Sequence, residues 1–145
     1  MGLYMALITW IYVSSAVRSL NNSDIQDILR HSREANAKSD ITGLLLFKGG
    51  NFMQVLEGDS EPVDELHQKI VNDPRHTGLI TIIRSPISNR SFSDWKMGFK
   101  DIGHLTEEEK AAHSDYLDRP LNDRSYISNP NEAFILLQAF KSTVR

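Results

Sequence analysis

The chain has 145 residues, of which 40% are hydrophobic and 24% charged, and it contains no cysteine. This length and composition fit one domain with a single core. The absence of Cys excludes disulfides, thiolate nucleophiles, iron–sulfur clusters and thioether-linked cofactors. With 16 basic and 19 acidic residues and a net charge of -3, the chain lacks the basic surface that direct binding to nucleic acid requires.

The first 17 residues carry no charge. A secretory leader begins with basic residues, whereas the first basic residue here, Arg18, follows the apolar stretch. The stretch is also too short and too polar to span a bilayer. We therefore expect a cytoplasmic protein that does not bind membranes. The β-branched and aromatic residues at 8–13 predict a buried first strand.

A helix is expected next. Ser23 and Gln26 have the S-x-x-Q spacing of a capping box, which predicts a helix that starts near Asp24. One face of this helix is apolar in its first turns and becomes polar in its last two turns: the face runs through Ile25, Ile28, Leu29, Ser32 and Asn36. Such a face implies a polar partner beneath the end of the helix.

Downstream, residues 41–57 predict a hairpin with a tight turn at 48–51. Helical spacing follows over 61–72, and strands are expected over 79–83 and 92–99. The resulting order is βαββαββ. It predicts an α+β, ferredoxin-like fold, in which a four-stranded antiparallel sheet gains one extra strand and carries two helices on one face.

The remaining residues predict two further helices. Thr106 and Glu109 form a second capping box ahead of a helix over 107–116, and Asn129-Pro130 precedes the other. The last helix has an apolar stripe, which either packs on the chain's own sheet or contacts a partner; its members are Ala133, Phe134, Leu137 and Phe140. We expect a domain over 1–100 and a helical extension over 101–145 that join in one compact unit.

Three polar residues occupy positions where the pattern predicts core. Tyr12 has the parity of Ile8 and Trp10 in the first strand, and Gln54 has the parity of its apolar neighbours in the third. Asn36 ends the apolar stripe of the first helix. Each could be an ordinary buried polar group with a backbone partner, because an unpartnered one costs about 1 to 3 kcal/mol. Their occurrence on adjacent elements favours a shared pocket.

A second polar cluster follows the second helix: Lys69, Asp73, Arg75 and His76. It is either a solvated helix end, where Asp73 pairs with Lys69, or a set of cations for a phosphate or ribityl group. No hydrolase, nucleotide-loop or zinc-protease motif is present, so we expect neither an enzyme nor a metal site. The acidic residues around Gly58, including Glu57, are expected in a solvated loop.

Five motifs in this order resemble one family. They are Ile11-Tyr12-Val13-Ser14-Ser15, Asn36 ahead of Asp40-Ile41-Thr42-Gly43-Leu44-Leu45, Phe52-Met53-Gln54-Val55-Leu56-Glu57-Gly58, Asp73-Pro74-Arg75-His76, and Phe92-Ser93-Asp94-Trp95-Lys96-Met97. Together they look like the BLUF family, the sensors of blue light using FAD. The resemblance covers about residues 3–99. The tail is similar to the helical extension of short, stand-alone members.

The resemblance implies the fold predicted above, with a non-covalent flavin (FAD, or FMN or riboflavin) between the two helices. It implies that Tyr12 is the photochemical tyrosine, which transfers an electron and a proton, and that Gln54 rearranges its hydrogen bonds between the phenol and the flavin. Trp95 and Met97 match the pair whose placement changes with light. The resemblance also implies flavin contacts for a further set of residues: Ser32, Asn36, Lys69, Asp73, Arg75 and His76.

Two residues depart from the family pattern. Ala35 stands where relatives often carry a polar or basic contact to the ring edge, which predicts that one interaction is missing. Trp10 replaces a more usual aliphatic residue, and its indole is a candidate competing electron donor. The output is expected to leave through the fifth strand and the terminal helices, toward a downstream protein partner or a changed homo-oligomer, as a dimer or larger.

Two other functions stay open from the residues alone. One is a ferredoxin-like binding or small hydrolytic module, but only Arg18 lies in the loop where an acylphosphatase-like enzyme needs several cations. An RNA-binding sheet needs a basic face, which the charge balance opposes. The other is a non-photoactive adaptor that assembles through its terminal helices. An absorption spectrum discriminates among all of these functions.

Overall fold

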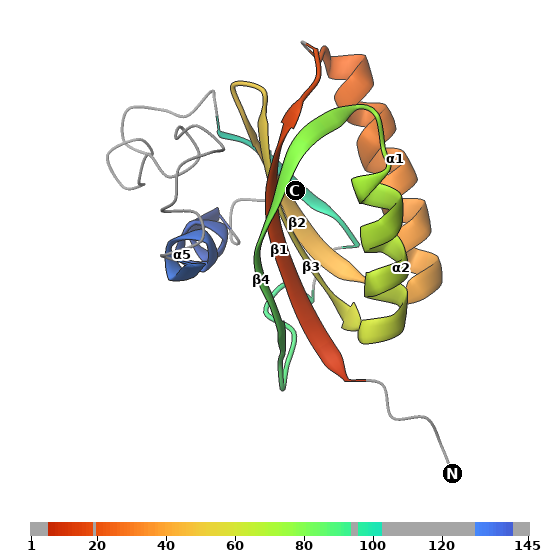
Figure 1. Cartoon of the computed structure of the whole chain (residues 1–145), viewed down its shortest axis with the longest axis vertical. Helices are drawn as coiled ribbons and strands as arrows, with labels where there is room; N and C mark the ends of the chain where they lie inside the picture. Colours follow the sequence, from red (N-terminus) through yellow and green to blue (C-terminus); the bar gives the residue numbers. More distant parts are fainter. Residues whose placement is uncertain (1–5, 19, 94–95, 103–129, 141–145) are drawn as a thin grey trace.

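The computed structural model describes residues 6–18, 20–93, 96–102 and 130–140. Five strands form one sheet in the order β4-β1-β3-β2-β5 (Figure 1). Their bounds are β1 Leu7–Ala16, β2 Thr42–Lys48, β3 Asn51–Asp59, β4 His76–Pro86 and β5 Gly98–Asp101. The first four pair antiparallel with their neighbours, whereas β5 pairs parallel with β2. The predicted ferredoxin-like sheet with one extra strand is therefore confirmed.

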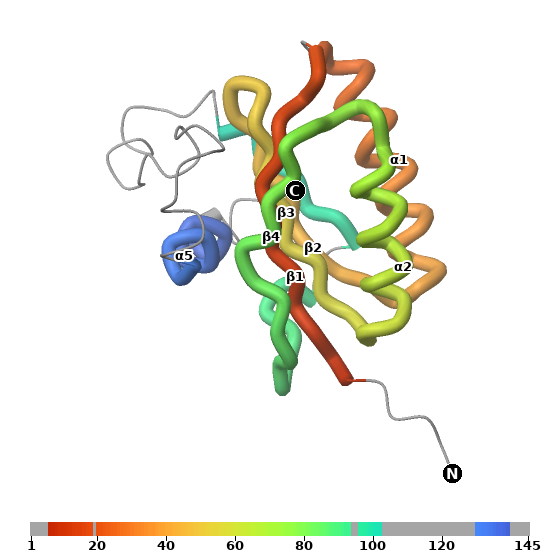
Figure 2. Tube along the Cα trace, in the orientation of Figure 1, coloured from red at the N-terminus to blue at the C-terminus, as the bar shows by residue number. Residues whose placement is uncertain are grey.

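Helices cover both faces of this sheet. Helix α1 (Asn22–Ser39) and helix α2 (Ser60–Val71) lie side by side on one face, and α5 (Pro130–Phe140) lies on the other (Figures 1 and 2). The buried residues accordingly form two clusters, one on each side of the sheet. Within the described ranges, no helix is long and apolar enough to cross a membrane.

Helix α5 packs on the chain's own sheet, which was one of the two alternatives for its apolar stripe. The stripe is different from the predicted one, because Ala133, Leu136 and Leu137 are buried against the sheet. Phe134 is 36% exposed and touches Phe92 edge to face, with ring centroids 6.3 Å apart. The side chain of Phe140 lies outside the described part of the chain, as do Asn129 and the helix predicted over 107–116.

Helix α1 begins two residues before the predicted start. Its N-cap is Asn21, whose side chain accepts a hydrogen bond from the Asp24 N–H, while the Asp24 carboxylate accepts from the Asn21 N–H. The capping box predicted from Ser23 and Gln26 is wrong because Asn caps a helix as well as Ser does, and two overlapping boxes fit this sequence. The predicted face is retained, with Ile25, Leu29 and Asn36 buried.

The β2–β3 hairpin turns where predicted. Gly49 and Gly50 have φ of 55° and 89°, values that the two-residue turns favoured in hairpins require. Nearer the hairpin's open end, β2 approaches β3 so closely that a Cβ on Gly43 would lie 2.1 Å from the Val55 carbonyl oxygen. This register places Leu45 opposite Gln54, and it sets the floor of the site described below.

The fifth strand is shorter and later than predicted. Residues 92–99 were expected to form it, but β5 spans Gly98–Asp101. The backbone N–H groups of Ser91 and Phe92 donate instead to the Glu57 carboxylate, at 2.8 and 2.7 Å. Glu57 is only 2% exposed, so its predicted place in a solvated loop is wrong. A buried carboxylate that satisfies two backbone donors ties this segment to β3 without strand pairing.

Candidate functional site

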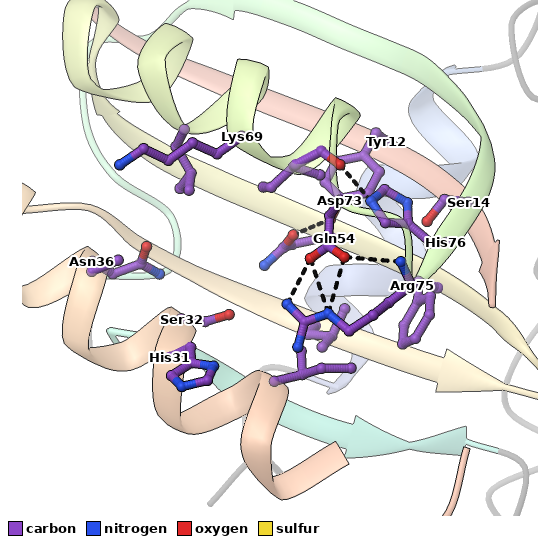
Figure 3. Close-up of a pocket in the computed structure, with 16 residues that line it drawn as sticks. Tyr12, Ser14, His31, Ser32, Asn36, Gln54, Lys69, Asp73, Arg75 and His76 are labelled. Carbon is purple, nitrogen blue, oxygen red and sulfur yellow. Dashed lines mark hydrogen bonds and ion pairs between the residues drawn. The ribbon is translucent and has the colours of Figure 1, made fainter. Parts of the chain in front are cut away.

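A cavity of about 260 Å³ lies between α1, α2 and the sheet (Figure 3), just below the range of about 300 to 1,000 Å³ that is usual for small-molecule sites. Both helices and the strands β1, β2 and β3 contribute to its wall. The cavity brings together eight of the residues selected from the sequence: Tyr12, Ser32, Asn36, Gln54, Lys69, Asp73, Arg75 and His76. Met97 lies buried beside Gln54, and Trp95 lies outside the described residues.

Tyr12 and Gln54 form the polar floor of this cavity. They are direct partners in the antiparallel β1–β3 register, so both side chains leave the same face of the sheet. The Tyr12 hydroxyl donates a hydrogen bond to Gln54 Oε1. The other end of the carboxamide, Nε2, donates to the Met97 Sδ at 3.2 Å. A continuous hydrogen-bonded chain therefore runs from the phenol through the carboxamide to the thioether.

The environment keeps the Tyr12 phenol protonated. Burial raises the pKa of Tyr12 well above its ordinary value, and the negative charge of Asp73 raises this pKa further. Gln54 and Tyr12 are each only 5% exposed. The phenol is therefore a hydrogen-bond donor throughout the neutral pH range.

We expect this raised pKa to make the protein less stable at high pH. Above about pH 10 a tyrosine in the unfolded chain releases its proton, whereas folded Tyr12 retains it. The unfolded state then binds fewer protons, so the free energy of unfolding falls as the pH rises through this window. Urea unfolding between pH 9 and 11 measures the slope, which should be less steep in Tyr12→Phe by up to about 1.4 kcal/mol per pH unit. Equal slopes in the two proteins would contradict the prediction.

Asn36 closes the cavity at the C-terminal end of α1. Its side chain is 1% exposed, and its Nδ2 donates to the Lys96 carbonyl at 2.5 Å. In the part of the chain that the structure describes, its Oδ1 accepts no hydrogen bond. The carboxamide can therefore hold the chain at Lys96 with one end and offer an acceptor to a ligand N–H with the other.

Asp73 and Arg75 form a close ion pair at the cavity wall. The Asp73 carboxylate accepts from Arg75 Nη2 at 2.6 Å and from Nε at 3.0 Å, and these bonds lower the pKa of Asp73. The pair of Asp73 with Lys69, one of the two alternatives for this cluster, is absent from the interactions among the described residues. Helix α2 ends at Val71, so Asp73 lies beyond it and helical i, i+4 spacing does not bring the two together.

One ring nitrogen of His76 in this wall has no hydrogen-bond partner in the described part of the chain. Its Nε2 lies 2.5 Å from the Ile70 carbonyl oxygen, whereas its buried Nδ1 has no partner among the described residues. Buried polar atoms are nearly always hydrogen-bonded. Because His76 lies beside Asp73 and Arg75 (Figure 3) and Lys69 lines the same cavity, the wall suits a ligand whose polar tail offers hydroxyl or phosphate oxygens.

Comparison with known proteins gives the family. The model of the family described as sensors of blue-light using FAD, BLUF, matches residues 7–98. The chain belongs to the BLUF family. Its relatives include the photoactivated adenylate cyclase subunit beta of Euglena longa, 38% identical over 92 residues, which are 63% of this chain and 11% of that protein. The blue light- and temperature-regulated antirepressor of Escherichia coli K12 is 32% identical over 96 residues, 66% of this chain and 24% of that protein.

Solved BLUF structures agree with this fold. The dark-state structure of the BLUF protein BlrB has a TM-score of 0.77 at 30% identity, covering 96% of this chain and 98% of that one. A bacterial light-regulated adenylyl cyclase has a TM-score of 0.68 at 34% identity, covering 70% of this chain and 30% of that one. The chain therefore spans a small part of its cyclase relatives and nearly all of BlrB. Residues 7–98 therefore form a domain of the BLUF type.

The wall has features that fit a flavin. The cavity combines apolar side chains from both helices and the sheet with the acceptor of Asn36 and the unsatisfied nitrogen of His76. Ala35 also lines the cavity and contributes no polar side-chain atom. That one contact to the flavin ring edge is missing at this position stays a prediction. With no Cys in the chain, attachment of a flavin to a cysteine thiol is excluded.

Trp10 belongs to an aromatic stack next to the site. Its ring lies against Tyr12 with centroids 4.5 Å apart and an interplanar angle of 27°, and His67 lies on it at 4.1 Å. The indole N–H donates to Thr81 Oγ1 at 2.9 Å. The stack places an oxidisable ring in contact with Tyr12, and the role of Trp10 as a competing electron donor stays a prediction.

Several residues of the site were not selected from the sequence. Ser14 and His31 also line the cavity, and Arg33 donates from Nε to the Met97 carbonyl at 3.0 Å. Ser14 follows Tyr12 by two positions in β1, so strand parity alone could have found it. Arg33 gave no such signal, because a long side chain that reaches a distant carbonyl leaves no periodic pattern. The described residues hold no cluster of His, Asp and Glu side chains suited to a metal ion.

Proposed function

We propose that this BLUF domain switches through the hydrogen-bonded chain Tyr12–Gln54–Met97 beneath a flavin bound between α1 and α2. The observation that carries the proposal is this chain at the cavity floor, with the Tyr12 hydroxyl on Gln54 Oε1 and Gln54 Nε2 on the Met97 sulfur. All three side chains are 5% exposed or less. Hydrogen bonds in such an environment are strong, and exchanging them changes the energy of neighbouring groups.

The residue types suit light-driven electron and proton transfer. The flavin supplies absorption of blue light and an excited state that accepts an electron. Tyr12 supplies the electron, and its hydroxyl proton has a direct path along the bond to Gln54. Gln54 has an acceptor and a donor end, so rotation or tautomerisation of its carboxamide changes the hydrogen bond that it offers to the flavin. A stronger bond to the flavin ring oxygen would shift the flavin absorption to the red.

The same exchange at Gln54 also changes its contact with Met97. In the structure the carboxamide donates to the sulfur, and a thioether accepts hydrogen bonds but has none to donate. If Oε1 replaces Nε2 at this place, the contact loses its hydrogen bond. Met97 directly precedes β5, which pairs with β2. A change at Gln54 thereby reaches the edge of the sheet.

The remaining site residues are proposed to hold the flavin. Asn36 offers Oδ1 to the ring edge, and Ser32 lies on the same helix one turn earlier. Lys69, Arg75 and His76, together with Asp73, suit the ribityl chain or its phosphate. The positive charges of Lys69 and Arg75 would favour a flavin that carries phosphate, FAD or FMN, over riboflavin, and FAD is the flavin named for the family.

The proposed output is a protein contact. The switch turns over no substrate, and in the cytoplasm it would act on a downstream partner or on a dimer or larger assembly of this chain. Two elements would carry the change. One is β5, next to Met97, and the other is α5, which packs on the opposite face of the sheet and has Ile135 65% exposed.

The absorption spectrum of the purified protein tests the proposal. We expect flavin absorption bands, present on purification or after reconstitution with FAD, FMN or riboflavin. Blue light should shift these bands reversibly to the red, and the shift should decay in darkness. A protein that stays colourless after reconstitution would refute flavin binding and favour the adaptor alternative. A flavin-loaded protein whose spectrum does not change under blue light would refute the proposed light-driven switch.

A further inference from the structure

Two consecutive carbonyl groups ahead of β5 are held by side chains of α1. Asn36 Nδ2 donates to the Lys96 carbonyl at 2.5 Å, and Arg33 Nε donates to the Met97 carbonyl at 3.0 Å. Arg33 and Asn36 are three positions apart, so they lie on neighbouring positions of one helix face. The Met97 residue is therefore held twice, by its carbonyl on α1 and by its sulfur on Gln54.

The main chain is fixed again immediately after Met97. Gly98 pairs with Leu44 at the start of the parallel β2–β5 ladder. Met97 thus lies at a junction between α1, β2 and the cavity floor, and it is only 2% exposed. A displacement of its backbone would change the position of the sulfur relative to Gln54, whose Nε2 donates to it at 3.2 Å.

Arg33 is well suited to hold this backbone. Its bond to Met97 is charge-assisted, and such bonds are stronger than neutral ones. Within the described ranges, Arg33 takes part in no ion pair, so no carboxylate there draws the guanidinium away from Met97. Arg30, one turn earlier on the same helix, pairs instead with Asp27 at 3.1 Å.

We propose that Arg33 is a positioning residue that holds the Met97 main chain so that the Met97 sulfur stays against Gln54. The consequence for the switch, that Arg33 favours the arrangement in which Gln54 donates to Met97, rests on the function proposed above. The placement of Met97 itself does not, and it can be measured in protein without flavin and without light.

The test compares two substitutions of matched length. In Arg33→Gln the Nε2 stands the same number of bonds from the backbone as the Arg Nε, so a donor to the Met97 carbonyl is retained without the charge. In Arg33→Leu the donor is lost. Arg30→Leu is the control, since it removes an arginine from the same helix without touching the Met97 segment.

The first measurement is oxidation of Met97 by hydrogen peroxide in flavin-free protein in the dark, followed by peptide mass spectrometry. Sulfoxide formation follows exposure of the sulfur, so we expect Met97 to oxidise about fivefold faster in Arg33→Leu and within about twofold of the original rate in Arg33→Gln and Arg30→Leu. Met53, which is fully buried on the opposite face of the sheet, serves as the internal reference and should not change.

Three outcomes would overturn the proposal: an unchanged Met97 rate in Arg33→Leu, an equally fast rate in Arg33→Gln, or a parallel rise at Met53, which would indicate general loosening. We take the arrangement with Gln54 on Met97 as the dark one, so with flavin bound Arg33→Leu should also slow the thermal return of the red shift about threefold, because the state to which the protein returns is less favoured. An unchanged return would overturn the role in the switch. If the original protein shows no light response, the proposed function fails, and the oxidation rates still decide the position of Met97.

Discussion

Replacing Tyr12 with Phe is expected to abolish the light-induced red shift while the protein still binds flavin. The substitution keeps the ring, and with it the stack on Trp10 at 4.5 Å and the shape of the cavity floor. It removes the hydroxyl that donates to Gln54, so the proton of the proposed transfer is gone. The measurement is the difference spectrum between illuminated and dark protein, with flavin content determined from the same sample.

The substitution also has a cost in stability. Gln54 Oε1 loses its partner at the floor of the cavity, and a buried acceptor left without a partner lowers the free energy of unfolding by about 1 to 3 kcal/mol. Thr81→Val is the matched control, because it breaks the bond from Trp10 to Thr81 in the adjacent strand pair and leaves the Tyr12 hydroxyl in place. That variant should keep the red shift. A normal shift in Tyr12→Phe would remove Tyr12 from the mechanism.

The floor of the site could be predicted from the sequence because strands impose strict alternation. Tyr12 and Gln54 share parity with apolar neighbours that are buried beneath α1 and α2, and alternation places each of them on the same face as those neighbours. The register then makes them direct partners. Periodicity also predicted the position of Asn36. Helical spacing places Asn36 on the same buried face of α1 as Ile25 and Leu29.

Other features depend on contacts between distant segments and could not be predicted. The stretch after β4 is anchored by the Glu57 carboxylate rather than by strand pairing. No feature of the sequence around Glu57 distinguishes it from a solvent-exposed glutamate. Asp73 pairs with Arg75 because α2 ends before it, and the ends of helices are poorly defined by periodicity. The Arg33 contact joins residues 64 positions apart.

Replacing Gln54 with Leu is expected to abolish the red shift and also to destabilise the fold. Leu is similar in volume but has neither the acceptor that Tyr12 uses nor the donor that Met97 uses. The buried Tyr12 hydroxyl is left without a partner, which costs about 1 to 3 kcal/mol. Urea unfolding in the dark measures this loss, and the difference spectrum measures the switch. Gln68→Leu, which changes an exposed carboxamide on α2, is the control and should retain both.

The double variant Tyr12→Phe, Gln54→Leu separates the bond between the two residues from their other contacts. If the hydroxyl and the carboxamide are partners, removing both leaves no unsatisfied polar atom between them, so the double variant is less destabilised than the sum of the singles. We expect a coupling of about 1 kcal/mol in a double-mutant cycle of unfolding free energies. Destabilisation that adds to within about 0.3 kcal/mol would contradict the bond on which the proposed switch depends. Because the cycle is measured in flavin-free protein in the dark, it tests the bond independently of whether light acts on it.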